Sequence, residues 1–206
     1  MSPATITAVH AIVPLTILEA IQHLDAPTHD GLEEFHYELA VKRLGMSETV
    51  AAQIERFRRL ADRGRRVEAE EAAALFRLVG RRNDAGLVFA DAGRQAGRRA
   101  MRSTAGSGAL ARRGIPGFAR NGLGFAVARR AVRVFDASLD RREGLTFAVI
   151  SDPPSALTTP HAVGCGFYGS AMAEILRELT DFDGAMFHVK CRSKGDSECR
   201  WSEREG

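Results

Sequence analysis

The residues best suited to chemistry lie near the end of the chain, where Cys165, His188, Cys191 and Cys199 follow the spacing C-x22-H-x2-C-x7-C. All 3 cysteines of the 206-residue sequence belong to this pattern. Thiolate and imidazole groups in a set of four suit Zn²⁺, which prefers tetrahedral coordination by soft or borderline ligands. The pattern therefore predicts a zinc site.

Other interpretations of these residues stay open. Free cysteines are often small buried hydrophobic residues, and a Cys191–Cys199 disulfide is sterically possible across a hairpin. Nothing in the sequence points to an oxidising compartment. His188 could be an ordinary residue of a surface strand, and three other side chains are rival ligands: His161, Asp196 and Glu198.

The predicted ligands belong to a helix and a terminal hairpin. Lys194-Gly195-Asp196 predicts a turn between strands at 185–191 and 199–203, and Cys165 precedes an amphipathic helix at 167–179. Residues three apart in a flat strand face opposite sides, so His188 and Cys191 converge only with a bulge or a turn beginning at Cys191. Four protein ligands leave no open position, so we expect structural zinc that ties the helix to the hairpin.

Three segments carry a family resemblance: Gly164-Cys165-Gly166-Phe167-Tyr168, then 185–191, then Gly195-Asp196-Ser197-Glu198-Cys199-Arg200-Trp201. They resemble the 4-vinyl reductase domain of bacteriochlorophyll 4-vinyl reductase-like proteins and of the sensors in phenol-responsive activators. The resemblance covers about residues 144–202 and, more loosely, 67–99. The sensors hold zinc with Cys, Glu, Cys and Cys at the same spacings, so His188 stands here where they carry a glutamate.

The resemblance implies a zinc-stabilised binding module for a hydrophobic small molecule, aromatic or tetrapyrrole-like, acting as carrier or sensor. It also implies a homodimer. The strand at 144–150 has Phe147 but lacks the tryptophan that the phenol sensors carry there, which argues against phenol itself. Candidate ligand-binding residues, some of which could equally be core or loop packing, are Phe118, Leu123, Phe125, Phe147, Phe167 and Tyr168.

Two alternative functions are a bacteriochlorophyll or chlorophyllide 4-vinyl reductase (or an accessory factor of pigment synthesis) and a protein-interaction scaffold. The sequence has no legible Ser-His-Asp set or paired carboxylates, and no convincing nicotinamide, flavin or iron–sulfur motif. We therefore assign no catalytic residues and favour binding over catalysis.

Composition predicts one compact α+β unit. The chain is 45% hydrophobic with a formal net charge of +3. Residues 1–66 form an N-terminal helical segment with a possible dimerisation surface, and residues 67–206 form the binding domain. No signal peptide or membrane span is apparent, so we expect a cytoplasmic protein.

Arginine is concentrated in residues 92–135, which contain ten arginines and no acid. These side chains could be solvated helix faces paired with acids elsewhere, or a patch for ligand carboxylates, an acidic partner or a membrane surface. Nucleic acid is not expected, because no helix-turn-helix pattern stands out.

Periodicity predicts N-terminal helices that pack on a small antiparallel sheet and its zinc-stapled hairpin. We expect Leu78 and Leu87 to face inward, a loop or lid over 106–125, and a hairpin that pairs 132–135 with 145–150. A short strand or extended arm is expected over 6–13. The helices are expected at 14–24, 31–44, 47–61, 67–79 and 84–101.

Overall fold

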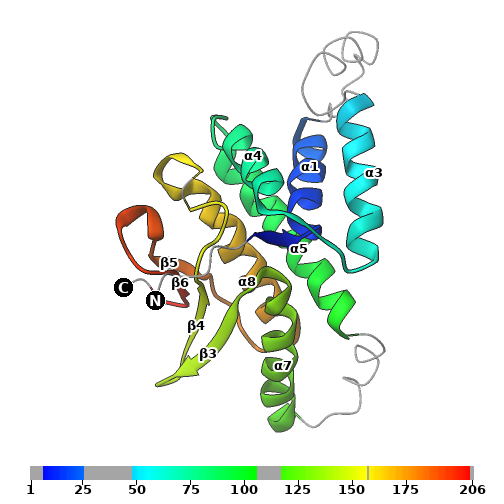
Figure 1. The fold of residues 1–206 in the computed structure, drawn as a ribbon. Helices are drawn as coiled ribbons and strands as arrows, with labels where there is room; N and C mark the ends of the chain where they lie inside the picture. Colours follow the sequence, from blue (N-terminus) through cyan, green and yellow to red (C-terminus); the bar gives the residue numbers. More distant parts are fainter. Residues whose placement is uncertain (1–6, 26–47, 106–116, 157, 205–206) are drawn as a thin grey trace, which may run out of the picture.

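The structure, a computed structural model, describes residues 7–25, 48–105, 117–156 and 158–204. It is an α+β protein, as predicted, with a helical layer beside a small antiparallel sheet (Figure 1). The described helices are α1 (Ile12–Asp25), α3 (Glu48–Asp62), α4 (Ala69–Val79), α5 (Ala85–Ala105), α7 (Gly117–Ala131) and α8 (Gly166–Leu179).

Two antiparallel sheets complete the described part of the chain. The larger has the order β3-β4-β6-β5, built from β3 (Ser138–Arg142), β4 (Leu145–Ile150), β5 (Phe187–Lys190) and β6 (Cys199–Ser202). The smaller pairs β1 (Ala8–His10) with β2 (Arg66–Glu68), with Val9 opposite Val67. A strand that precedes α1 therefore pairs with a strand that precedes α4, which links the two ends of the N-terminal segment.

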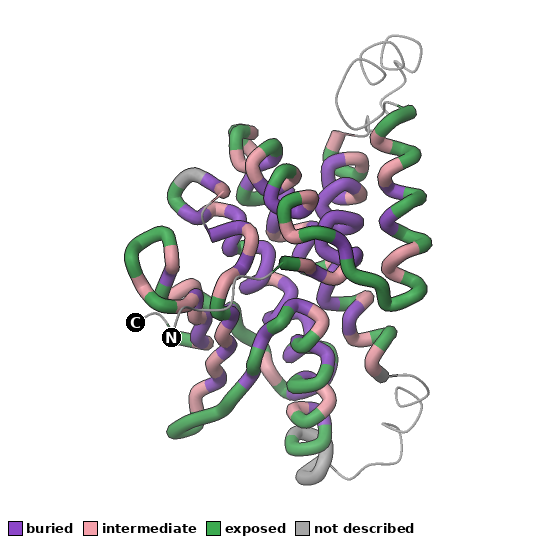
Figure 2. The backbone as a smooth tube through the Cα atoms, in the orientation of Figure 1, coloured by how far each residue is buried: buried purple, intermediate pink, exposed green. Residues whose placement is uncertain are grey.

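Helix α8 lies at the centre of the molecule. It packs along α5 and α7 on one side and against β5 on the other. Helix α1 packs on α5, and α3 packs on α1, so the N-terminal helices reach the sheet through α5 and α8 (Figure 1). Figure 2 shows α1 largely buried and α3 with a broad exposed face, as expected for an outermost helix.

Small residues allow α5 and α8 to approach closely. Ala92, Ala96 and Ala100 of α5 are fully buried. A Cβ atom added at Gly93 would lie 2.2 Å from the carbonyl oxygen of Phe167, and one at Gly97 would lie 2.6 Å from that of Ala171. No side chain other than hydrogen fits these positions, so the glycines set the distance between the helices.

The structure corrects four local predictions. Leu78 and Leu87 are exposed, at 42% and 68%, because the buried stripes of α4 and α5 pass through their neighbours Val79 and Val88. The strand partner of β4 is β3, and residues 132–135 form a 3₁₀ turn. Residues 117–125 of the expected loop or lid belong to the helix α7, and the remainder of that loop, 106–116, lies outside the described residues, as does the predicted helix 31–44.

The other predicted elements are confirmed. Helices appear near 14–24, 47–61 and 84–101, and the strand at 145–150 matches β4. The helix predicted at 67–79 begins two residues late because 66–68 is the strand β2. Helix 167–179 is α8, with Met172, Ile175, Leu176 and Leu179 buried as predicted.

Candidate metal centre

Cys165, His188, Cys191 and Cys199 converge at one end of the larger sheet. One ligand atom from each of the four lies within 4.8 Å of every other. Cys165 directly precedes α8, Cys191 follows β5, and Cys199 opens β6. The four residues can therefore hold a metal ion between the start of α8 and the terminal hairpin.

A β-bulge brings His188 and Cys191 to the same side. In the β5–β6 pairing His188 lies opposite Trp201, yet Lys190 lies opposite Arg200, so β5 carries an extra residue between them. A 3₁₀ turn, Arg192–Lys194, begins directly after Cys191 and ends at Gly195, whose φ of 96° suits glycine. This is the departure from a flat strand that the H-x2-C spacing required.

The donor atoms fit a tetrahedral ion. The Sγ atoms of Cys191 and Cys199 are 4.0 Å apart, and a tetrahedron of about 2.3 Å metal–sulfur bonds has edges of about 3.8 Å. The Nε2 atom of His188 is buried and has no hydrogen-bond partner among the described residues. A buried imidazole nitrogen without a partner loses its hydration, and binding a metal ion would replace it.

Neighbouring groups hold the thiols in position. Ser155 Oγ lies 3.3 Å from Cys165 Sγ, and Ser193 Oγ lies 2.9 Å from Cys191 Sγ. The carboxylate of Asp196 accepts a hydrogen bond of 2.7 Å from the backbone N–H of Cys191. Contacts of this kind orient metal ligands without touching the ion.

Trp201 joins the hairpin to α8. Its indole Nε1 donates to the carbonyl oxygen of Cys165 at 3.2 Å, and its ring stacks on His188 with centroids 4.9 Å apart. The indole ring also contacts the ring of Tyr168. The Tyr168 ring in turn contacts the rings of Phe167 and Phe76, which continue the aromatic core toward α4. The sequence analysis gave Trp201 no role at the site. The only hint in the sequence was the predicted hairpin, which places Trp201 on the strand next to that of His188.

The thiols interact strongly with one another. A hydrogen bond from Cys165, together with His188 and the backbone N–H of Arg192, lowers the pKa of Cys199 to about 5, against the effect of burial. The same hydrogen bond, with burial, raises the pKa of Cys165.

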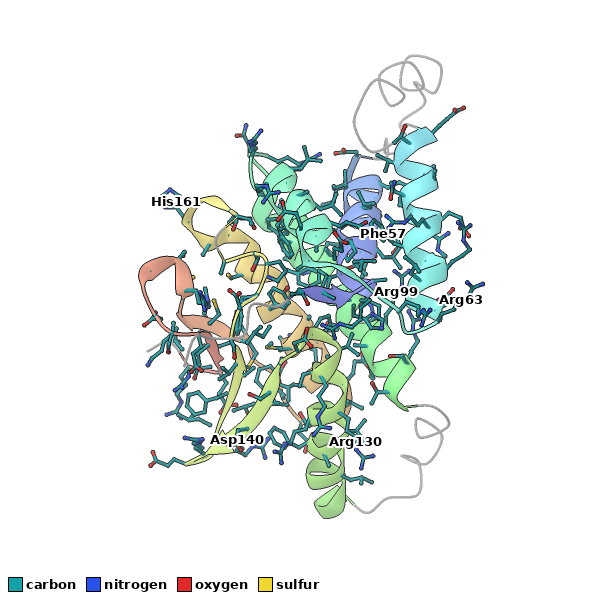
Figure 3. The ribbon with its side chains drawn as sticks, viewed as in Figure 1. Phe57, Arg63, Arg99, Arg130, Asp140 and His161 are labelled. Atoms are coloured by element: carbon teal, nitrogen blue, oxygen red, sulfur yellow. The ribbon has the colours of Figure 1, made fainter. Side chains whose placement is uncertain are left out.

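The rival ligands take other roles. His161 is exposed on the loop before α8 and points away from the cluster (Figure 3). Asp196 is engaged by the backbone of Cys191, and Glu198 forms an ion pair with Arg200 at 2.7 Å. The histidine of the cluster is His188.

The predicted ligand-binding residues do not form one site. Phe167 and Tyr168 are buried in the aromatic core. Leu123 is 52% exposed on α7, and the half-buried ring of Phe125 lies under the guanidinium group of Arg141 at 4.6 Å. Phe147 lines a pocket on the sheet, and Phe118 lies in α7 with its side chain outside the described part.

The arginines of 92–135 divide into two groups. Arg94, Arg98 and Arg99 on α5 form ion pairs with Asp91, Glu174 and Glu19. Arg129 and Arg130 are exposed at the end of α7 beside β3, and Arg133 is exposed in the 3₁₀ turn that follows. The first group matches the interpretation of helix faces paired with acids, and the second leaves positive charge near the sheet.

Comparisons with protein-family models, curated proteins and solved structures found no match to this chain. None of the described helices has the length and apolar character needed to cross a membrane.

Proposed function

We propose that this protein is a small-molecule-binding module, a carrier or sensor, whose terminal hairpin is fixed to α8 by a structural zinc ion. The observation that carries the zinc proposal is the convergence of four ligand atoms within 4.8 Å, one of them the unpartnered Nε2 of His188. Three thiols and one imidazole are typical ligands of structural zinc.

A structural role follows from the number of ligands. Cys165, Cys191 and Cys199 are buried, and with His188 they would complete a tetrahedral shell without water. Because only the folded chain brings the four ligands together, the free energy of metal binding adds to the stability of the folded state. Short hairpins are marginally stable alone, and β5 and β6 have only four residues each.

Binding of a hydrophobic small molecule is supported by the resemblance to 4-vinyl reductase domains and by the pocket beside Phe147. The pocket has a volume of about 400 Å³, within the range typical of ligand sites. The helical core around Phe167 is filled by its own aromatic rings.

Native mass spectrometry of the purified protein tests the zinc proposal. We expect one zinc ion per chain in the wild type and in His161→Ala, whose exposed histidine is the matched control. Cys191→Ser and His188→Ala should lose the ion or bind it much more weakly. A co-purified small molecule would add its mass and identify the ligand.

A stable wild-type protein without metal would overturn the zinc proposal, provided that Cys191→Ser leaves its thermal midpoint unchanged. Binding of cobalt(II) gives a second test, since tetrahedral thiolate coordination has a characteristic visible spectrum that His188→Ala should alter and His161→Ala should not.

A further inference from the structure

We propose that the pocket beside β3 and β4 binds an aromatic molecule that carries an oxyanion such as a carboxylate. This deepens the small-molecule part of the proposed function and rests on that part. The argument rests on which sheet face forms the pocket, on the charges around it, and on one unsatisfied donor.

The floor of the pocket is the outer face of the sheet. Leu145, Phe147 and Val149 alternate in β4 with the buried Thr146, Ala148 and Ile150, so they share the opposite face. All three are partly exposed. They form an apolar strip whose middle residue offers an aromatic ring for stacking.

The neighbouring strands extend this surface. Phe147 lies opposite Asp140 on one side and Ser202 on the other, and Ser202 also faces Phe187. Phe187 is 38% exposed, whereas Ser202 is buried. Two phenylalanines therefore flank one serine on the outer face, which extends the apolar strip from the pocket toward β5.

Arginines stand around the apolar strip. Arg129 reaches the pocket from α7, Arg142 from β3, and Arg200 from β6. The acids among the lining residues are Asp140 and Glu143, and Asp140 accepts a hydrogen bond of 3.2 Å from Arg142. Arg129 has no ion pair within salt-bridge distance among the described residues, and its charge also acts on Asp140 across the pocket.

Arg200 contributes a donor without an acceptor. Its Nη2 donates to Glu198 at 2.7 Å, but its Nε is buried and has no hydrogen-bond partner among the described residues. A buried N–H without an acceptor is unfavourable. Arg200 lies opposite Val149 in the pocket wall and its side chain is 37% exposed, so the exposed part of its guanidinium group can meet a ligand oxyanion over β4.

Together these features specify the ligand class. An apolar strip with one aromatic ring favours a flat apolar body, and arginine recognises planar oxyanions by its fork of N–H donors. The volume of about 400 Å³ holds a molecule of two or three rings and is too small for a folded protein partner.

The test compares two fluorescent probes with the same aromatic body. Anilinonaphthalene sulfonate carries an oxyanion, and N-phenylnaphthylamine does not. We expect the wild type to bind the sulfonate at least about tenfold more tightly, as for a hydrogen bond to a charged group. Phe147→Ala should weaken both probes, whereas Arg200→Gln and Arg129→Gln should weaken only the sulfonate.

The control is Arg63→Gln, which removes an exposed arginine on the far side of the molecule from Asp140 and the pocket (Figure 3). Its probe affinities should equal those of the wild type. Metal content and thermal midpoint are measured for every variant, because Arg200 is adjacent to Cys199. Arg129→Gln, on α7, keeps the test valid if Arg200→Gln disturbs the hairpin.

The proposal would be overturned if the wild type bound both probes with equal affinity. It would also be overturned if neither arginine substitution changed the affinity for the sulfonate. Metal content measured beside each titration makes failure of the pocket and failure of the metal site distinguishable, because a variant that keeps its zinc and loses sulfonate binding has lost only the pocket. If Phe147→Ala left tight binding of N-phenylnaphthylamine unchanged, the protein would still be a small-molecule-binding module, but its binding site would not be the pocket beside β3 and β4.

Discussion

At the scale of single residues, two histidines show how the environment of a ring nitrogen decides its use. His188 has a buried Nε2 without a partner, which suits a metal ligand. His10 instead accepts a hydrogen bond of 3.1 Å at Nδ1 from the backbone N–H of Ile12, at the start of α1. That bond satisfies one of the free N–H groups of the first helical turn and requires Nδ1 to be unprotonated.

The cap at His10 predicts a pH dependence of stability. Burial, and then the charge of Arg66, lowers the pKa of His10 below its ordinary value of 6.5. The unfolded state therefore binds the proton more readily than the folded state, so this contribution is present above about pH 6.5 and is lost as the pH falls. His10→Ala should cost about 1 kcal/mol at about pH 7.5 and less at about pH 5.

Urea denaturation across this pH range measures the effect. His10→Asn keeps a capping acceptor that does not titrate, so its free energy of unfolding should vary less with pH than that of the wild type. His161→Asn, at an exposed site, should follow the wild type. Parallel curves for the wild type and His10→Asn would contradict the assignment.

At the scale of elements, glycine contacts decide where helices can lie. A Cβ atom added at Gly124 of α7 would be 1.7 Å from the carbonyl oxygen of Leu179, at the end of α8. Gly122 in the same helix has no atom within 4 Å of such a Cβ position. One glycine is thus required by packing, whereas the other only lowers the helix propensity of α7.

Alanine substitutions at these positions should therefore act in opposite directions. Gly124→Ala should destabilise the protein by about 3 kcal/mol or more, because α7 must move away from α8. Gly122→Ala should stabilise it by about 0.5–1 kcal/mol through helix propensity. Denaturant unfolding measures both, and equal effects of the two substitutions would contradict the close packing of α7 on α8.

At the scale of the whole molecule, the cluster joins two parts that are far apart in the sequence. Cys165 belongs to the chain before α8, and the other three ligands belong to the last hairpin. Helices α1 and α3 pack on each other away from the cluster, whereas α5 packs on α8 and on the 3₁₀ segment that ends at Cys165. Removal of the ion should therefore loosen the hairpin and the start of α8 more than the distant helices.

Chelation tests this expectation. Extraction of the metal should cost at least about 3 kcal/mol, or about 6–12 °C in Tm for a chain of this size. Trp201 is the only tryptophan and stacks on His188, so its fluorescence emission should shift to longer wavelength as water enters the site. Addition of zinc should reverse this shift.

Hydrogen exchange measures which elements loosen. After chelation, the exchange rate of backbone amides should rise in β5 and β6 before it rises in α1. A uniform rise across all helices would contradict this division.

The sequence by itself determined helices α1, α3, α4, α5 and α8, the strand β4 and the three cysteines of the cluster, with His188 as the preferred fourth member among open rivals. Helices α1, α5 and α8 follow from apolar periodicity, which is a local property of the chain. The unusual H-x2-C spacing was enough to require a bulge or a turn beginning at Cys191, and the structure contains both. Residue type limited the chemistry, because three thiols and an imidazole favour soft and borderline metal ions.

Only the tertiary structure decided features that depend on distant neighbours. The 3₁₀ turn at 132–135 replaces the predicted strand because β3 supplies the partner of β4, and apolar alternation alone cannot choose between adjacent segments. Exposure of Leu87, the stacking of Trp201 on His188 and the free Nε of Arg200 depend on residues far away in the sequence. Their roles are set by packing, which no local pattern encodes.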